Sequence, residues 1–174
     1  MVEPERGAAS YPEKGDSPAS VSVDELLNLA DLEQAAANYE SAIRTYRRAL
    51  DVTESLAQAD VLVQKAKALT GIGSCLERIG RWKEAQNVLE DAALAARQAG
   101  DDLELGRVNI KLGKILLGQG RLDAALESGE TALKLVGKTD PSTRGFALNL
   151  LGTVHNFKGD SETSARCFED ALSA

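Results

Sequence analysis

Four columns of small residues recur along this chain with one shared spacing, and this spacing limits the possible folds more than any other feature. In every column the step between successive members is 43, then 40, then 39 residues. The columns are Ala30, Gly73, Gly113 and Gly152; Ala37, Gly80, Gly120 and Gly159; Ala42, Ala85, Ala125 and Ser164; and Ala49, Ala92, Ala132 and Ala171. Random composition does not keep four columns in register, so the chain is an array of similar units. Such arrays stack into elongated folds that typically serve as binding surfaces.

Each unit is predicted to hold two helices joined by a tight turn, which makes the chain all-α. Aromatic residues are only 4% of the sequence, and the abundant Ala, Leu, Glu, Lys, Arg and Gln favour helix over sheet. In the second unit, apolar residues at positions i, i+3, i+4 and i+7 predict one buried helix face; they are Leu69, Ile72, Gly73 and Leu76. Gly80 follows, where a helix end favours a left-handed residue. Small residues at a helix crossing let the two backbones approach closely, so we expect Gly73→Leu to harm the fold.

The composition changes at the start of the array. The first 20 residues contain three of the four prolines and little that could be buried. This composition predicts a disordered leader over residues 1–21. The repeat domain is expected over 22–174, with units at about 23–60, 61–100, 101–139 and 140–174.

Charge, cysteine content and hydropathy indicate which partners and which compartment the protein is expected to have. The net charge of −7 argues against a general nucleic-acid binder, which would show a dominant basic field. Cys75 and Cys167 form no CxxC pair and follow no secretory signal, which predicts a reduced, cytoplasmic compartment. No apolar run approaches the roughly 20 residues that a membrane helix needs, so no membrane contact is expected.

The pattern Leu-x2-Leu/Ile-Gly-x2-Leu, followed by Gly with a polar residue and then by Ala, resembles the tetratricopeptide repeat. The clearest stretches are Gly80-Arg81-Trp82-Lys83-Glu84-Ala85, Tyr39-Glu40-Ser41-Ala42-Ile43 and Gly159-Asp160-Ser161-Glu162. The resemblance covers about residues 23–174. It implies a right-handed superhelical solenoid of antiparallel helix pairs in four units, with a concave face lined by the first helix of each unit.

Two departures from the family pattern stand out. The period is near 40 residues rather than the commonest 34, and long-period versions resemble those of kinesin light chains, cell-polarity adaptors and bacterial transcription regulators of the maltose-activator type. Gly129 stands where the family prefers an aromatic or large aliphatic residue, so we expect loose packing in the third unit.

The predicted groove side of the first helices carries several cations. Helical spacing places Arg107, Lys111 and Lys114 together on the third unit. The full set of candidate partner-binding residues is Lys67, Arg78, Arg107, Lys111, Lys114 and Asn149. Such a cluster suits a carboxylate-rich peptide; the alternative is that these are ordinary solvated side chains paired with nearby acids.

One family variant grips a C-terminal carboxylate through a Lys/Asn/Asn/Lys/Arg set. Here only Arg107 and Lys111 match its basic pair, by charge. Leu27, Asp31 and Gly71 stand where that set has its other lysine and two asparagines. A chaperone-tail clamp of this type is therefore not expected.

No pattern for catalysis, metal binding or a cofactor is found, and we expect a protein that is not an enzyme. His155 is the only histidine, and the resemblance places it at a core aromatic position. Without further histidines or clustered cysteines a zinc site is not expected. Gly71-x-Gly73 lies inside a predicted helix, so it is not a phosphate-binding loop.

Two functional hypotheses follow. The first is an interaction scaffold that binds a peptide or helix of a partner protein in the concave groove. The alternative is a regulatory or sensor segment of a larger signalling or transcription-regulatory protein. Because no polar helix follows the last unit, we expect a piece of a longer protein, with self-association through the uncovered helix as a side effect.

Overall fold

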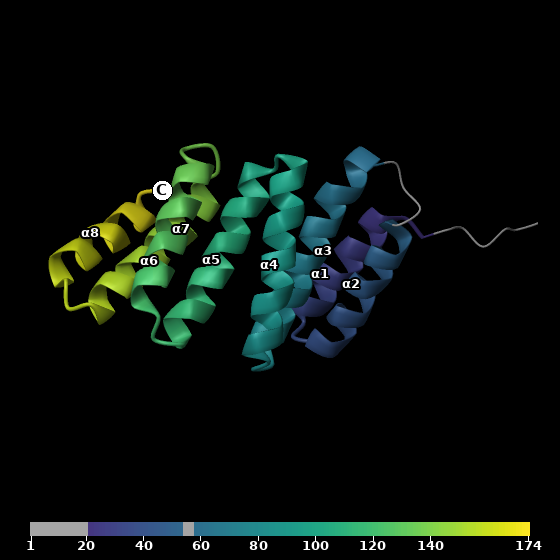
Figure 1. Cartoon of the computed structure of the whole chain (residues 1–174), viewed down its shortest axis with the longest axis horizontal. Helices are drawn as coiled ribbons and strands as arrows, with labels where there is room; N and C mark the ends of the chain where they lie inside the picture. The colour runs from purple at the N-terminus through teal and green to yellow at the C-terminus, as the bar shows by residue number, and fades with distance from the viewer. Residues whose placement is uncertain (1–20, 54–57) are drawn as a thin grey trace, which may run out of the picture.

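The computed structural model describes residues 21–53 and 58–174, and within these residues every regular element is an α-helix. The predicted leader therefore lies, apart from Val21, outside the described residues. The helices follow one another in a row (Figure 1). Their bounds are α1 Val23–Ala35, α2 Tyr39–Thr53, α3 Gln58–Arg78, α4 Trp82–Ala99, α5 Asp102–Gly118, α6 Leu122–Val136, α7 Pro141–Phe157 and α8 Ser161–Leu172.

The helices form pairs that stack into a solenoid, as the repeat predicted. Consecutive helices pack against each other, and each of α1, α3 and α5 also contacts the first helix of the next pair. Among the described helices, no contact joins two that lie more than two positions apart. Helix α3 begins at Gln58, slightly before the expected start of the second unit at 61.

Local sequence sets where each helix begins and ends. Ser22 and Glu25 form a reciprocal capping box at the start of α1. The aspartates Asp101, Asp140 and Asp160 each accept a hydrogen bond from a backbone N–H in the first turn of α5, α7 and α8.

The second column of small residues closes the first helix of each pair. Gly80, Gly120 and Gly159 have φ values of 81°, 73° and 82°, so the predicted left-handed closure is confirmed. The first unit has Ala37 at this position, with a φ of 60°. This alanine is held in a conformation that glycine adopts without a steric penalty.

The other small residues allow close contact between helices. A Cβ at Gly73 would lie 2.6 Å from Leu89 Cγ, and one at Gly152 would lie 2.8 Å from Phe168 Cε1. The alanines of the last two columns are buried wherever α2, α4 and α6 carry them. The packing role assigned to these residues is therefore confirmed.

The expectation of loose packing at Gly129 is wrong. Gly129 is buried, and a Cβ there would lie 2.7 Å from Leu151 Cδ2. The volume that a large side chain on α6 would occupy is filled by Leu151 of α7 instead. Packing is thus as close here as at the other crossings.

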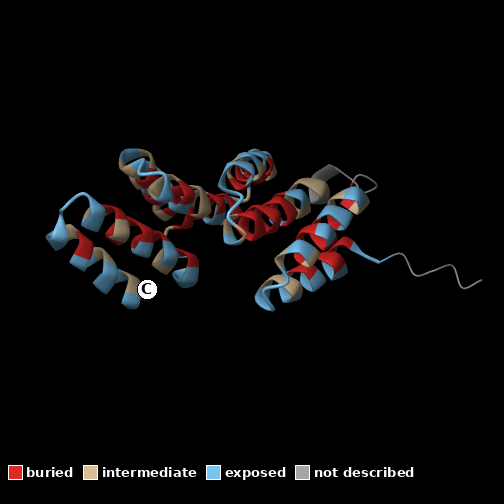
Figure 2. Ribbon diagram, turned by 90° about the horizontal axis from the view of Figure 1, so that it is seen from below, coloured by how far each residue is buried: buried red, intermediate tan, exposed pale blue. Residues whose placement is uncertain are grey.

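The core is divided along the row (Figure 2). Buried residues face the neighbouring helices. They form one large cluster over α1 to α5, a small cluster where α3, α4 and α5 meet, and two small clusters over α5, α6 and α7. No described helix is both long enough and apolar enough to cross a membrane. Because each first helix contacts the next one, α1, α3, α5 and α7 share one face of the molecule, which is named the groove face below.

Candidate functional site

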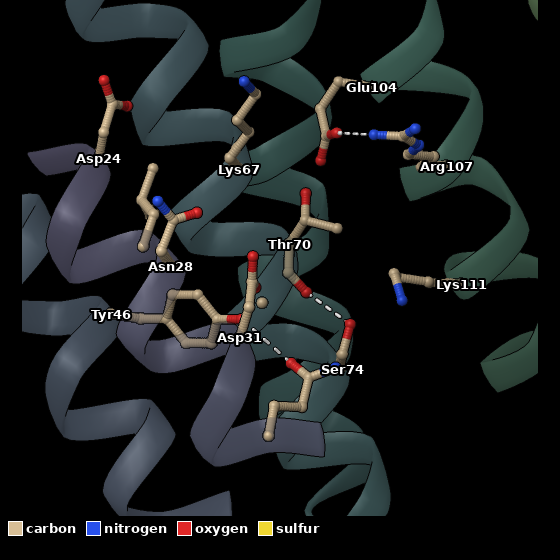
Figure 3. Close-up of a pocket in the computed structure, with 13 residues that line it drawn as sticks. Asp24, Asn28, Asp31, Tyr46, Lys67, Thr70, Ser74, Glu104, Arg107 and Lys111 are labelled. Carbon is tan, nitrogen blue, oxygen red and sulfur yellow. Dashed lines mark hydrogen bonds and ion pairs between the residues drawn. The ribbon is translucent and has the colours of Figure 1, made fainter. Parts of the chain in front are cut away.

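Two adjacent pockets open on the groove face. The first lies between α1, α3 and α5, has a volume of about 400 Å³, and is shown in Figure 3. The second lies between α5 and α7 and has a volume of about 300 Å³. Arg107 and Lys111 line both pockets. The two pockets are therefore adjacent, and together they draw lining residues from all four first helices.

The pocket between α1, α3 and α5 has walls of opposite charge. Asp24 and Asp31 lie on its α1 side, and Arg107 and Lys111 lie on its α5 side (Figure 3). Lys67 of α3 lies between them. The two α1 carboxylates accept hydrogen bonds only from neutral groups among the described residues, Asp24 from Gln64 and Asp31 from Tyr46. The α1 wall is thus acidic, and neither of its carboxylates forms an ion pair among the described residues.

Tyr46 reaches this pocket from the second helix of the first pair. Its Oη donates to Asp31 Oδ1 at 2.5 Å and lies 3.2 Å from Gln34 Oε1. Gly71 has no side chain to block this path, and a Cβ there would collide with the Tyr46 ring. Burial, together with the Asp31 carboxylate, raises the pKa of Tyr46, so the phenol stays a neutral donor.

Cys75 lies next to the same polar group. Its Sγ is 3.4 Å from Gln34 Oε1, and the residue is fully buried. Burial raises the pKa of the Cys75 thiol to about 11. A buried thiol that remains protonated is a poor nucleophile, and this residue acts as a small part of the core, as predicted.

Arg107 joins α5 to the start of α7. Its Nη1 lies 3.6 Å from Glu104 Oε2, and its Nη2 lies 3.6 Å from Asp140 Oδ2. Its Nε also lies 3.4 Å from Thr143 Oγ1. Glu104 is buried, so Arg107 supplies the charge that this carboxylate needs. Its guanidinium is therefore structural as well as part of the site.

Lys111 and Lys114 are the cations of α5 that have no carboxylate partner among the described residues. Lys111 is partly buried, and desolvation lowers its pKa from the ordinary value. Lys114 Nζ lies 5.8 Å from the centre of the Phe146 ring. Both ammonium groups are available to an anion that enters the groove.

The pocket between α5 and α7 combines apolar and basic side chains. Its lining residues are Arg107, Ile110, Lys111, Lys114, Ser142, Thr143 and Phe146. Phe146 is 55% exposed, although an aromatic side chain of this size is usually covered. None of the lining residues is a carboxylate. This pocket suits an apolar side chain with an acidic neighbour.

The structure gathers four of the six predicted site residues in these pockets: Lys67, Arg107, Lys111 and Lys114. Arg78 lies at the end of α3, where its Nε is 3.3 Å from Tyr39 Oη and its guanidinium lies 6.0 Å from the Tyr39 ring centre. Asn149 lines a third hollow, which shares Ser142 and Phe146 with the pocket between α5 and α7 and extends towards the end of α8.

Sequence reasoning did not identify the acidic half of the site. Asp24, Asn28 and Asp31 share one face of α1 at helical spacing, a signal that was present in the sequence. The contribution of Tyr46 could not be found this way, because it comes from a second helix and depends on the gap at Gly71.

No cluster of side chains with metal-binding character occurs among the described residues. His155 Nδ1 lies 3.3 Å from Asp160 Oδ2 at the turn between α7 and α8, and it lines neither pocket of the groove face. Its position in the structure is that of a partly buried residue beside a helix cap.

Comparisons with known proteins agree with this architecture. The family model for the tetratricopeptide repeat matches residues 23–93 and 64–138. No curated protein matches the sequence.

Solved structures resemble the fold. The crystal structure of MamA has a TM-score of 0.61 and 21% identity, over 88% of this chain and 78% of that one. The apo form of RapI has a TM-score of 0.74 and 11% identity, over 86% of this chain and 41% of that one. A Rap protein complexed with Competence and Sporulation Factor has a TM-score of 0.76 and 14% identity, over 87% of this chain and 42% of that one. At these identities the likeness shows the fold alone.

Proposed function

Because this chain belongs to the tetratricopeptide repeat family, we propose that it is an interaction scaffold that binds a peptide or helix of a partner protein on its groove face. The observation that supports this most strongly is that two adjacent pockets, which share Arg107 and Lys111, lie along the four first helices. A row of adjacent pockets suits an extended or helical segment better than a small molecule.

The chemistry of the site supports binding rather than catalysis. The buried thiol and phenol stay protonated, and the hydroxyl groups of Thr70 and Ser74 donate to backbone carbonyls of their own helix. No nucleophile is paired with a general base in either pocket. We therefore propose a protein without catalytic activity of its own.

A second candidate function is a regulatory or sensor segment of a larger signalling or transcription-regulatory protein. The observation that favours it is the similarity to Rap structures, of which this chain covers only 41% and 42%. Sequence beyond residue 174 in the source genome discriminates between the two, since a DNA-binding or nucleotide-binding motif there would favour the second. Cytoplasmic location and self-association through α8 stay predictions.

The groove is tested by affinity capture from a lysate of the source organism, with a charge-reversal variant beside the wild type. Reversal at Arg107, Lys111 and Lys114 together is the change that the sequence suggests. The structure favours a different choice, because reversal at Arg107 would place a third carboxylate beside Glu104 and Asp140. The groove variant is therefore Lys67→Glu with Lys114→Glu.

A matched control carries the same change of charge away from the groove. Lys83 of α4 and Lys134 of α6 are exposed and line neither pocket, so the control is Lys83→Glu with Lys134→Glu. A partner retained by the wild type and the control, lost by the groove variant, and cross-linked to Lys67 or Lys114 supports the proposal. A partner that all three proteins retain equally would contradict it.

A further inference from the structure

Opposite charges on the two ends of the site define the kind of segment that it accepts. Resting on the function proposed above, we propose that the bound segment is bipolar: it carries a basic side chain that pairs with Asp24 and Asp31 of α1, and an acidic side chain that pairs with Lys111 and Lys114 of α5. The groove thereby selects a partner by the presence of opposite charges at two positions rather than by net charge.

The acidic end of the site rests on two carboxylates. Asp24 accepts from Gln64 Nε2 at 3.1 Å, and Asp31 accepts from the Tyr46 hydroxyl at 2.5 Å. No cation lies within ion-pair distance of either among the described residues. Both line the pocket, together with the neutral Asn28 between them. A lysine or arginine of a ligand would supply the missing positive charge.

The basic end rests on the two lysines of α5. Glu77 and Glu104 act on Lys111 electrostatically, but neither forms an ion pair with it, and Glu104 is paired with Arg107 at 3.6 Å. Lys111 has lost part of its hydration to burial and gains no ion pair in return. Lys114 forms no ion pair among the described residues, and its Nζ lies 5.8 Å from the centre of the Phe146 ring. An aspartate or glutamate of a ligand would stabilise the charged form of Lys111, which burial disfavours.

The distance between the two ends sets the spacing in the ligand. Helix α3 lies between α1 and α5 and contacts both. Packed helices are about 8–10 Å apart, so the axes of α1 and α5 are separated by at most roughly 16–20 Å, and their charged side chains line one shared pocket. An extended chain rises about 3.3 Å per residue, so the basic and acidic residues of the ligand are expected to be separated by about five residues at most.

The alternative occupants have the wrong charge at one end. A uniformly acidic segment would meet Asp24 and Asp31, and a uniformly basic segment would meet Lys111 and Lys114. Like charges brought together across an interface oppose binding. The apolar pocket beside Phe146 adds contact area next to the acidic residue of the ligand, but it does not discriminate between these charge patterns.

Immobilised pools of blocked peptides test the inference. Each pool has two fixed positions about five residues apart and randomised residues elsewhere. The fixed pairs are Lys with Glu in either order, Lys with Lys, Glu with Glu, and Gln with Gln. The full chain should bind the Lys/Glu pool about tenfold better than the Gln/Gln pool, a difference near 1.4 kcal/mol. The two like-charge pools should bind no better than Gln/Gln.

Two wall variants assign each charge preference to its residues. Asp24→Asn with Asp31→Asn keeps acceptors for Gln64 and Tyr46. This variant should lose the preference for lysine in the peptide and keep the preference for glutamate. Lys111→Gln with Lys114→Gln should lose the preference for glutamate and keep the preference for lysine. Circular dichroism and thermal midpoints confirm that both variants fold.

The results also separate this inference from the function on which it rests. Peptide binding that the groove variants reduce, but that shows no preference for Lys/Glu, would overturn the bipolar ligand and leave a binding groove. Peptide binding that no groove or wall variant changes would overturn both. A Lys/Glu preference that survives in both wall variants would also overturn the inference, because the charges would then lie elsewhere.

Discussion

Replacing Gly73 by alanine tests the packing role of the small residues directly. The added methyl would lie 2.6 Å from Leu89 Cγ and 2.7 Å from Leu89 Cδ2. Leu89 is fully buried, and Cγ is its branch point. Rotation of the terminal methyl groups therefore cannot relieve the contact, so α3 and α4 must separate or Leu89 must leave its preferred rotamer.

A matched variant isolates the cost of this contact. Gly145 of α7 also lies inside a helix, but a Cβ there would only contact the Ala171 carbonyl oxygen at 3.4 Å, an ordinary van der Waals distance. Alanine gains about 1 kcal/mol of helix propensity at either site. The difference in unfolding free energy between Gly73→Ala and Gly145→Ala is then the packing cost alone, about 1–3 kcal/mol.

Thermal unfolding followed by circular dichroism measures this difference. For a domain of this size, each kcal/mol shifts the midpoint by roughly 2–4 °C. Gly73→Ala should melt below the wild type or close to it, and Gly145→Ala should melt above it. Equal midpoints for the two variants would refute the argument, because they would show that Leu89 relocates at no cost.

Three further predictions concern single residues. Ala37→Gly should raise the unfolding free energy by about 0.5–1 kcal/mol in urea titrations, since relief of the left-handed strain exceeds the entropy that glycine adds to the unfolded chain; an unchanged midpoint would show that Ala37 is unstrained. The folded pKa of Cys75, about 11, lies above its ordinary value of 9.0, so stability should be full below pH 9 and fall by about 3 kcal/mol as pH rises through 11. Cys75→Ala should lack this part of the decline, and equal slopes in the two proteins would exclude the thiol as its source. Arg107→Ala should cost about 1–3 kcal/mol by leaving buried Glu104 without a cation. Added Glu104→Gln should restore most of that loss, and no recovery would count against the pairing.

The fold could be predicted from the sequence because the residues that close and cross the helices repeat. Gly80 and its equivalents marked the turns, and Gly73 marked a crossing that the structure confirms. The expectation for Gly129 was wrong because Leu151 of the next unit fills the space beside this glycine. A local pattern shows which residue is small, but it does not show which neighbour fills the space.

The candidate site was predictable only in part, for a related reason. Arg107, Lys111 and Lys114 lie on one helix, so their spacing alone brings them together. Tyr46 and Asp31 meet across two helices, and the space that admits Tyr46 is opened by Gly71 on a third. Arg107 pairs with Asp140 of the next unit, so it links two units and is not a free cation. Contacts of this kind depend on how the pairs stack.

The restriction of contacts to near neighbours has a mechanical consequence. No contact between described helices spans more than one boundary between successive pairs, so each boundary works as a separate joint. A segment seated between α5 and α7 would wedge this one joint open or draw it closed, and every helix beyond it would swing as a rigid lever. A change of angle at the Arg107 contact would then move α7 and α8 together relative to the three preceding pairs.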